Sequence, residues 1–182
     1  MLRKPLALIA LLLLSQLAFA QQTSEPVTTI FLIRHAERAD EPRQDPPLTE
    51  KGVARSQALA RLLSTADIKA IYTSQFARTK LTAAPLAKQL GVTATPLSLK
   101  ISASNPRAIA EESTKETVDK IMSQTGGSVL VVGHSNSIPD VIKMLGGDVV
   151  PTIDEKKFDD LFVVTVYAKG RAKVTHLKYG SE

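Results

Sequence analysis

The 182-residue chain contains no cysteine. This absence excludes a disulfide framework, and it also excludes the acylated cysteine that anchors a lipoprotein. Tryptophan is absent too, and aromatic residues make up only 4% of the chain. So few aromatic side chains leave no stacking platform for the bases of a nucleic acid.

Charge of one sign is also scarce. The chain has 23 basic and 18 acidic residues, a formal net charge of +5. Without its first twenty residues, which include Arg3 and Lys4, 21 basic residues remain against 18 acidic ones, a formal charge of +3. The basic residues are dispersed and form no stripe that follows a phosphate backbone. We therefore expect no nucleic-acid partner, whereas acidic small molecules remain natural ligands.

A long apolar run occurs only at the N-terminus. Residues 1–20 read as a secretory signal, with Arg3 and Lys4 as the charged region, 6–14 as the apolar region and Ala18-Phe-Ala20 as the cleavage signature. The run is shorter than the roughly 20 apolar residues of a membrane-spanning helix. We expect cleavage before Gln21 and export to the periplasm or the medium, with no membrane span afterwards. An uncleaved anchor is the alternative.

Residues 21–182 have a length that suits one domain. Short β-branched runs alternate with helical patterns, which predicts an α/β fold with a mostly parallel sheet covered by helices. The expected strands are 27–33, 69–73, 129–132, 161–167 and 172–177, with 93–97 as a further candidate. Four helices are expected. The first begins after Thr49, the second spans 77–90, the third spans 107–122, and a short fourth helix ends at Leu145.

Arginine or histidine residues follow three of these strands closely. Arg34 and His35 come after 27–33, Arg78 follows 69–73 by a few residues, and His134 comes after 129–132. Ligands of open α/β sheets bind at the carboxyl ends of the strands, so we expect these side chains to converge. Each also has an ordinary interpretation as a surface salt-bridge partner or a helix-capping neighbour. The third histidine, His176, has no supporting motif, and we expect it to be structural.

Two histidines and two arginines at one sheet edge suit phosphoryl chemistry. A neutral imidazole is a competent nucleophile toward phosphorus, and His35 is the candidate. The planar forks of Arg34 and Arg78 would clamp the phosphoryl oxygens. His134 would donate to the same oxygens beside Ser135 and Asn136, where a helix begins. These residues need neither a metal nor a cofactor.

At these residues the chain resembles the histidine phosphatase superfamily, also called phosphoglycerate mutase-like. The matching segments are Leu32-Ile-Arg34-His35-Ala-Glu37, Ser74-Gln-Phe-Ala-Arg78-Thr79 with Thr82-Ala83, and Val132-Gly-His134-Ser-Asn136. The resemblance implies a three-layer α/β/α fold. It also implies a phosphorylated His35, a phosphate pocket of Arg34, Arg78 and His134, and phosphoryl hydrolysis or transfer without a metal.

The general acid for the leaving oxygen is not evident from the sequence. Mutase-like relatives carry a glutamate in a longer loop after the third strand, whereas this chain has only 101–106 and then Glu111-Glu112. Glu37, two residues beyond the nucleophile, and Asp160, before a C-terminal strand, are the candidates. A chain without an acid would favour good leaving groups such as phosphoramidates.

The short loops indicate a hydrolase with an open pocket, since a mutase needs covering elements. We expect a phosphatase acting on a small phosphomonoester in the envelope or on a glycolipid phosphate. The loop 39–47 lies near the expected pocket, and Arg38, Arg43 and Asp45 could select the substrate. An ordinary solvated loop is the interpretation that we favour for it. A phosphate-binding module with little turnover and a phosphohistidine protein phosphatase are the alternatives.

Overall fold

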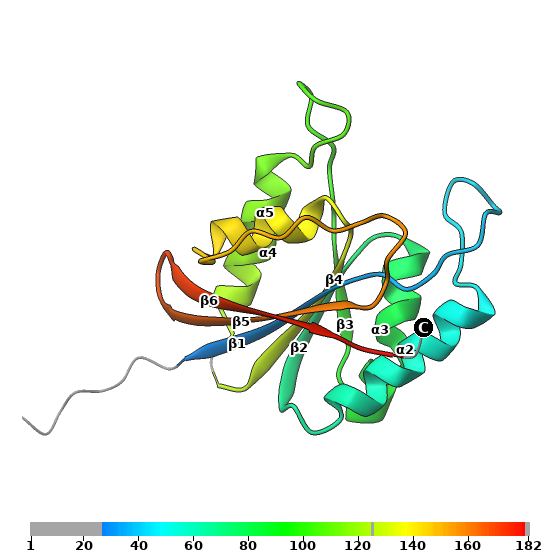
Figure 1. The fold of residues 1–182 in the computed structure, drawn as a ribbon, viewed down its shortest axis with the longest axis horizontal. Helices are drawn as coiled ribbons and strands as arrows, with labels where there is room; N and C mark the ends of the chain where they lie inside the picture. Colours follow the sequence, from blue (N-terminus) through cyan, green and yellow to red (C-terminus); the bar gives the residue numbers. More distant parts are fainter. Residues whose placement is uncertain (1–26, 125, 181–182) are drawn as a thin grey trace, which may run out of the picture.

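A six-stranded sheet forms the centre of the protein (Figure 1). The computed structural model describes residues 27–124 and 126–180, so the expected signal segment lies outside the described residues. The strand order is β3-β2-β4-β1-β5-β6. The strands are β1 (Thr28–Arg34), β2 (Ile68–Ser74), β3 (Ala94–Leu97), β4 (Ser128–Gly133), β5 (Asp160–Ala168) and β6 (Arg171–Lys178).

Helices cover both faces of this sheet. The described residues form α2 (Glu50–Leu63), α3 (Ala77–Leu90), α4 (Glu111–Met122) and α5 (Ser137–Met144). In Figure 1, α2 and α3 lie on one face and α4 and α5 on the other. β1, β2, β3 and β4 run parallel to one another, whereas β5 is antiparallel to both of its neighbours, β1 and β6. The predicted three-layer α/β/α architecture with a mostly parallel sheet is confirmed.

The apolar side chains of β1 show why the sheet needs two helical layers. Ile30 and Leu32 pack into the core beneath α4 and α5, whereas Phe31 and Ile33 pack into the core beneath α2 and α3. Successive side chains of a strand point to opposite faces, so a continuous apolar run buries both. Every residue of β4 is buried. Apolar side chains of β1 and β4 therefore pack on both faces of the sheet.

Local signals set the ends of two helices. The Thr49 hydroxyl accepts a hydrogen bond from the Gly52 amide, which is the expected N-cap of α2. Gly91 ends α3 with a φ of 66°, in the left-handed region that glycine adopts without a Cβ penalty. Pro85 lies past the first turn of α3, and the helix continues through it.

The predicted helix 107–122 is wrong at its start, because α4 begins at Glu111. The residues before α4 form antiparallel hydrogen bonds with the segment after β3. The Ser102 amide donates to the Ala108 carbonyl, and the Ala110 amide donates to the Lys100 carbonyl. The Asn105 side chain also accepts from the Arg107 amide, a local bond that competes with helix formation. The segment 101–109 is therefore a hairpin-like loop.

Among the helices of residues 27–124 and 126–180, none is both long enough and apolar enough to cross a bilayer.

Candidate active site

The two expected active-site histidines lie side by side at the carboxyl edge of the sheet. β1 and β4 are parallel neighbours with Arg34 opposite Gly133, and the His35 amide donates to the Gly133 carbonyl over 3.0 Å. The next residue of each strand is therefore a histidine at the same edge. The His35 and His134 ring centroids are 5.3 Å apart, with an edge-on arrangement.

His35 has the protonation state that a nucleophile needs. Its Nδ1 lies 2.8 Å from the Ala36 carbonyl oxygen, which can only accept, so Nδ1 carries the proton and Nε2 keeps its lone pair. Burial lowers the pKa of His35 to about 4, and the positive charges of Arg34 and Arg78 act in the same direction. The imidazole is therefore neutral at neutral pH, with Nε2 as the reactive atom.

His134 is fixed by a network of hydroxyl groups. Its Nε2 lies 2.9 Å from the Ser74 hydroxyl, which also bonds the Thr79 hydroxyl. Its backbone amide donates to the Ser137 hydroxyl at the start of α5. Burial, together with the charges of Arg78, His35 and Arg34, lowers the pKa of His134 to about 3. An arriving phosphate dianion would oppose these charges and favour a protonated, donating ring.

Arg34 connects the pocket to the loop before β5. Its Nη1 donates to the carbonyls of Asp154 and Lys157, each over 3.1 Å, and its Cζ lies 4.3 Å from the Phe158 ring centroid. Its Nε is buried and has no hydrogen-bond partner among the described residues. Burial lowers the pKa of Arg34, and the negative charge of Glu155 opposes that shift. The guanidinium therefore holds a loop and keeps a donor available.

Arg78 lies in the first turn of α3, with its Cζ 4.3 Å from the Phe76 ring centroid. Its Nη1 lies 3.9 Å from an Asp45 carboxylate oxygen. Asp45 also accepts from the Ala77 amide, which fixes the loop 39–47 to the start of α3. Burial lowers the pKa of Arg78, as does the charge of Arg38, whereas Asp45 raises it.

These side chains line one open pocket of about 300 Å³. The predicted members are Arg34, His35, Arg78, His134, Ser135 and Asn136, and the other lining residues are Arg38, Phe76, Leu99, Ile101, Ile109 and Glu155. Cationic and imidazole groups therefore face an apolar wall. The Asn136 amide is bonded to the Arg107 carbonyl, so it fixes the loop 101–109 at the rim.

Neither carboxylate expected as the general acid lines this pocket. Glu37 turns toward α2, where Arg55 donates to both of its oxygens over 2.8 to 3.1 Å. Burial alone would raise the pKa of Glu37, but the hydrogen bonds from Arg55 hold it below its ordinary value. Asp160 faces the neighbouring strand, where His176 and Lys178 bond to its Oδ1. Both carboxylates serve ion pairs here, and His176 has the structural setting expected of it.

Glu155 is the site residue that the sequence did not reveal. It lies in the irregular segment between α5 and β5, where no periodic pattern or motif marks a function. Hydrogen bonds from Arg34, far away in the sequence, and the stacking of Phe158 on its guanidinium hold this segment at the pocket.

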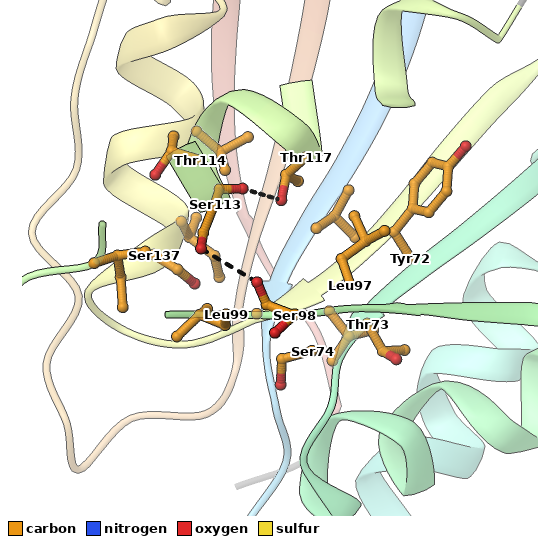
Figure 2. Close-up of a pocket in the computed structure, with 16 residues that line it drawn as sticks. Tyr72, Thr73, Ser74, Leu97, Ser98, Leu99, Ser113, Thr114, Thr117 and Ser137 are labelled. Carbon is orange, nitrogen blue, oxygen red and sulfur yellow. Dashed lines mark hydrogen bonds between the residues drawn. The ribbon is translucent and has the colours of Figure 1, made fainter. Parts of the chain in front are cut away.

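A second, smaller cavity of about 30 Å³ lies behind the pocket, between α4, α5 and the sheet (Figure 2). Figure 2 shows the Ser113 hydroxyl bonded to Ser98 and the Thr117 hydroxyl bonded to Ser113. Leu99 and Ile109 line both cavities. The apolar wall of the pocket is therefore a thin partition.

Metal binding needs clustered His, Cys, Asp or Glu side chains. Within residues 27–124 and 126–180, no three such side chains are grouped so that they could hold an ion.

Comparison with known proteins agrees with this geometry. The family model of the histidine phosphatase superfamily (branch 1) matches residues 30–99, which contain Arg34, His35 and Arg78. No curated protein sequence matches the chain significantly.

Solved structures match nearly the whole described fold. Phosphoglycerate mutase from Bacillus anthracis is 20% identical, with a TM-score of 0.65 over 86% of this chain and 95% of its own. The protein histidine phosphatase SixA, complexed with tungstate, is 18% identical, with a TM-score of 0.62 over 84% and 96%. A mycobacterial glucosyl-3-phosphoglycerate phosphatase is 14% identical, with a TM-score of 0.62 over 85% and 100%. The fold is thus phosphoglycerate mutase-like.

Proposed function

We propose that this chain, whose family match and fold support membership of the histidine phosphatase superfamily, hydrolyses a small phosphomonoester through a phosphohistidine on His35. One observation carries the proposal: a neutral, buried imidazole with a free Nε2 shares a pocket with two arginines and a second histidine. A phosphoryl group needs a nucleophile and surrounding donors, and these residues supply both.

Each residue has a distinct part in the proposed reaction. Nε2 of His35 attacks phosphorus, while Arg34 Nε, the Arg78 guanidinium and His134 donate to the equatorial oxygens. The Ser74 hydroxyl keeps the His134 ring in place. Water then attacks the phosphohistidine and releases inorganic phosphate. None of these steps is assigned to a metal.

A hydrolase suits the open pocket better than a mutase does. The pocket volume of about 300 Å³ is at the small end of the range for ligand sites, which favours a small substrate. Mycobacterial glucosyl-3-phosphoglycerate phosphatase, one of the similar structures, is named for such a substrate. SixA, another, is named a protein histidine phosphatase, which makes a phosphohistidine protein the second candidate.

Export is a further part of the proposal, and it rests on the charged, apolar and cleavage segments of residues 1–20. The substrate would then be a phosphomonoester of the envelope, including a glycolipid phosphate. Fractionation of the tagged protein, with N-terminal sequencing for a start at Gln21, tests this part separately.

The phosphoenzyme itself provides the main test. We expect rapid mixing with a ³²P-labelled aryl phosphate in EDTA, followed by alkaline quench, to trap an acid-labile phosphohistidine. His35→Asn should abolish the trapped label and lower turnover by on the order of 10³-fold or more. His176→Asn, which alters a half-exposed histidine outside the pocket, is the matched control and should keep the label.

Label that persisted in His35→Asn would overturn the role of His35. Tight phosphate binding without any phosphoenzyme would instead identify a binding module. Faster transfer from a phosphohistidine protein than from the aryl phosphate would favour the second candidate.

A further inference from the structure

The leaving group needs a proton donor, and the arginines of the pocket do not supply one. When the bond from phosphorus to an alcohol oxygen breaks, negative charge develops on that oxygen, and an alkyl alcohol needs a proton in the transition state. Arginines remain protonated at every accessible pH, so they stabilise charge without giving up a proton. His134, in its proposed role, donates to the equatorial oxygens rather than to the leaving oxygen. A proton donor is therefore needed elsewhere in the pocket.

Glu155 is the one carboxylate among the residues that line the pocket. The other nearby carboxylates have other partners: Glu37 bonds Arg55, and Asp45 bonds the Ala77 amide beside Arg78. Asp154 accepts from the Lys156 amide and is not among the residues that line the pocket. The Glu155 side chain is exposed at the pocket mouth, so it can exchange protons with solvent between turnovers. Position and access both suit a proton shuttle.

Arg34 fixes the loop that carries Glu155. The two carbonyls that accept from Arg34 Nη1 belong to Asp154 and Lys157, on either side of Glu155 in the chain. Phe158 stacks on the same guanidinium, and its ring centroid is 6.0 Å from that of His35. A phosphate-binding arginine thus sets the position of the carboxyl group relative to the phosphoryl site.

We propose that Glu155 is the general acid and base of the phosphatase reaction, which makes unactivated alkyl phosphomonoesters the substrate class; this inference rests on the proposed function. In the first step, Nε2 of His35 bonds to phosphorus as the ester bond breaks, and the Glu155 carboxyl proton passes to the departing oxygen. In the second step, the Glu155 carboxylate takes a proton from the attacking water as the nitrogen–phosphorus bond breaks. Alcohol and inorganic phosphate leave, and both side chains return to their starting state.

Two substrates with different leaving groups test this role. Single-turnover formation of the phosphoenzyme is measured with 4-nitrophenyl phosphate, whose leaving group needs no proton, and with 2-phenylethyl phosphate, whose leaving group does. We expect Glu155→Gln to slow the alkyl substrate by about 10² to 10⁴-fold, the usual contribution of a general acid, and the aryl substrate by less than about tenfold. Glu155→Asp should recover part of the alkyl rate.

Glu116→Gln is the matched control, because it makes the same chemical change at an exposed position on α4 that does not line the pocket. Equal slowing of both substrates by Glu155→Gln, or no slowing of either, would overturn the inference while the phosphohistidine chemistry stood. A wild-type enzyme that forms no phosphohistidine with either substrate would refute the proposed function itself, and this inference with it. Unchanged thermal unfolding of the Glu155 variants excludes misfolding as the cause.

Discussion

His35 and His134 are buried imidazoles among positive charges, and this setting lowers the stability of the protein in acid. Burial lowers the pKa of His35 to about 4 and that of His134 to about 3. An unfolded histidine has a pKa of about 6.5, so between these values the unfolded chain binds more protons than the folded chain. Stability therefore rises with pH through this window and is lost as the pH falls below about 6.5.

We predict that His35 alone makes the free energy of unfolding fall by about 2 kcal/mol between pH 7.5 and pH 5. Urea unfolding of the wild type and of His35→Asn at both pH values measures this. The variant should lose about 2 kcal/mol less than the wild type over the same interval. Parallel changes in the two proteins would show that His35 titrates alike in the folded and unfolded chains.

Most strands and helices of this protein can be predicted from the sequence, because the patterns that specify them are local. Runs such as 27–33 and 129–132 alternate between two covered faces, and each ends at the edge where Arg34 or His134 follows. The loop carrying Glu155 is positioned by hydrogen bonds from Arg34, 120 or more residues away in sequence, which no local pattern encodes. Glu37 was a candidate acid because it is close to His35 in the sequence. That closeness does not reveal its pairing with Arg55, which turns it away from the pocket.

Two buried threonines on neighbouring elements allow a prediction about hydrogen bonding at this scale. Thr73 on β2 lines the smaller cavity, and its hydroxyl has no partner among the described residues. The Thr82 hydroxyl on α3 donates to the Arg78 carbonyl and accepts from the Ala36 amide, next to the nucleophile. We expect Thr73→Val to raise the free energy of unfolding by about 1 kcal/mol and Thr82→Val to lower it by about 1 to 3 kcal/mol.

Urea unfolding of both variants at pH 7.5 gives the comparison, and the substitutions are close to isosteric, so volume changes cancel. Loss of stability in Thr73→Val would show that its hydroxyl bonds an ordered water, for which the cavity of about 30 Å³ has room. Thr82→Val should also slow phosphoenzyme formation, because the Ala36 carbonyl that fixes the His35 tautomer belongs to the same segment.

Arg55 joins three distant parts of the molecule. From α2 it donates to Glu37, two residues after His35, and to the Tyr179 carbonyl near the end of the described chain. The backbone of α2 lies close to the segment after β1, since a Cβ on Gly52 would lie 2.2 Å from the Glu37 carbonyl oxygen. The side chain of Arg55 is only 5% exposed and that of Glu37 14%, so water screens this pair weakly. The pair therefore fixes the segment after β1, which carries His35, to the helical layer of α2 and α3.

We predict that Arg55→Met lowers the free energy of unfolding by about 3 to 5 kcal/mol, because it leaves the Glu37 carboxylate largely buried without its main partner. Urea unfolding at pH 7.5 measures the loss.

Lys51→Met is the matched control, since Lys51 is 61% exposed and 3.8 Å from the same carboxylate, and should change stability by less than about 1 kcal/mol. The double variant Glu37→Gln with Arg55→Met should recover part of the loss, since it removes the unpaired charge. Additive losses in the double variant would instead mean that Arg55 stabilises the fold through packing and its bond to Tyr179, with the ion pair contributing little.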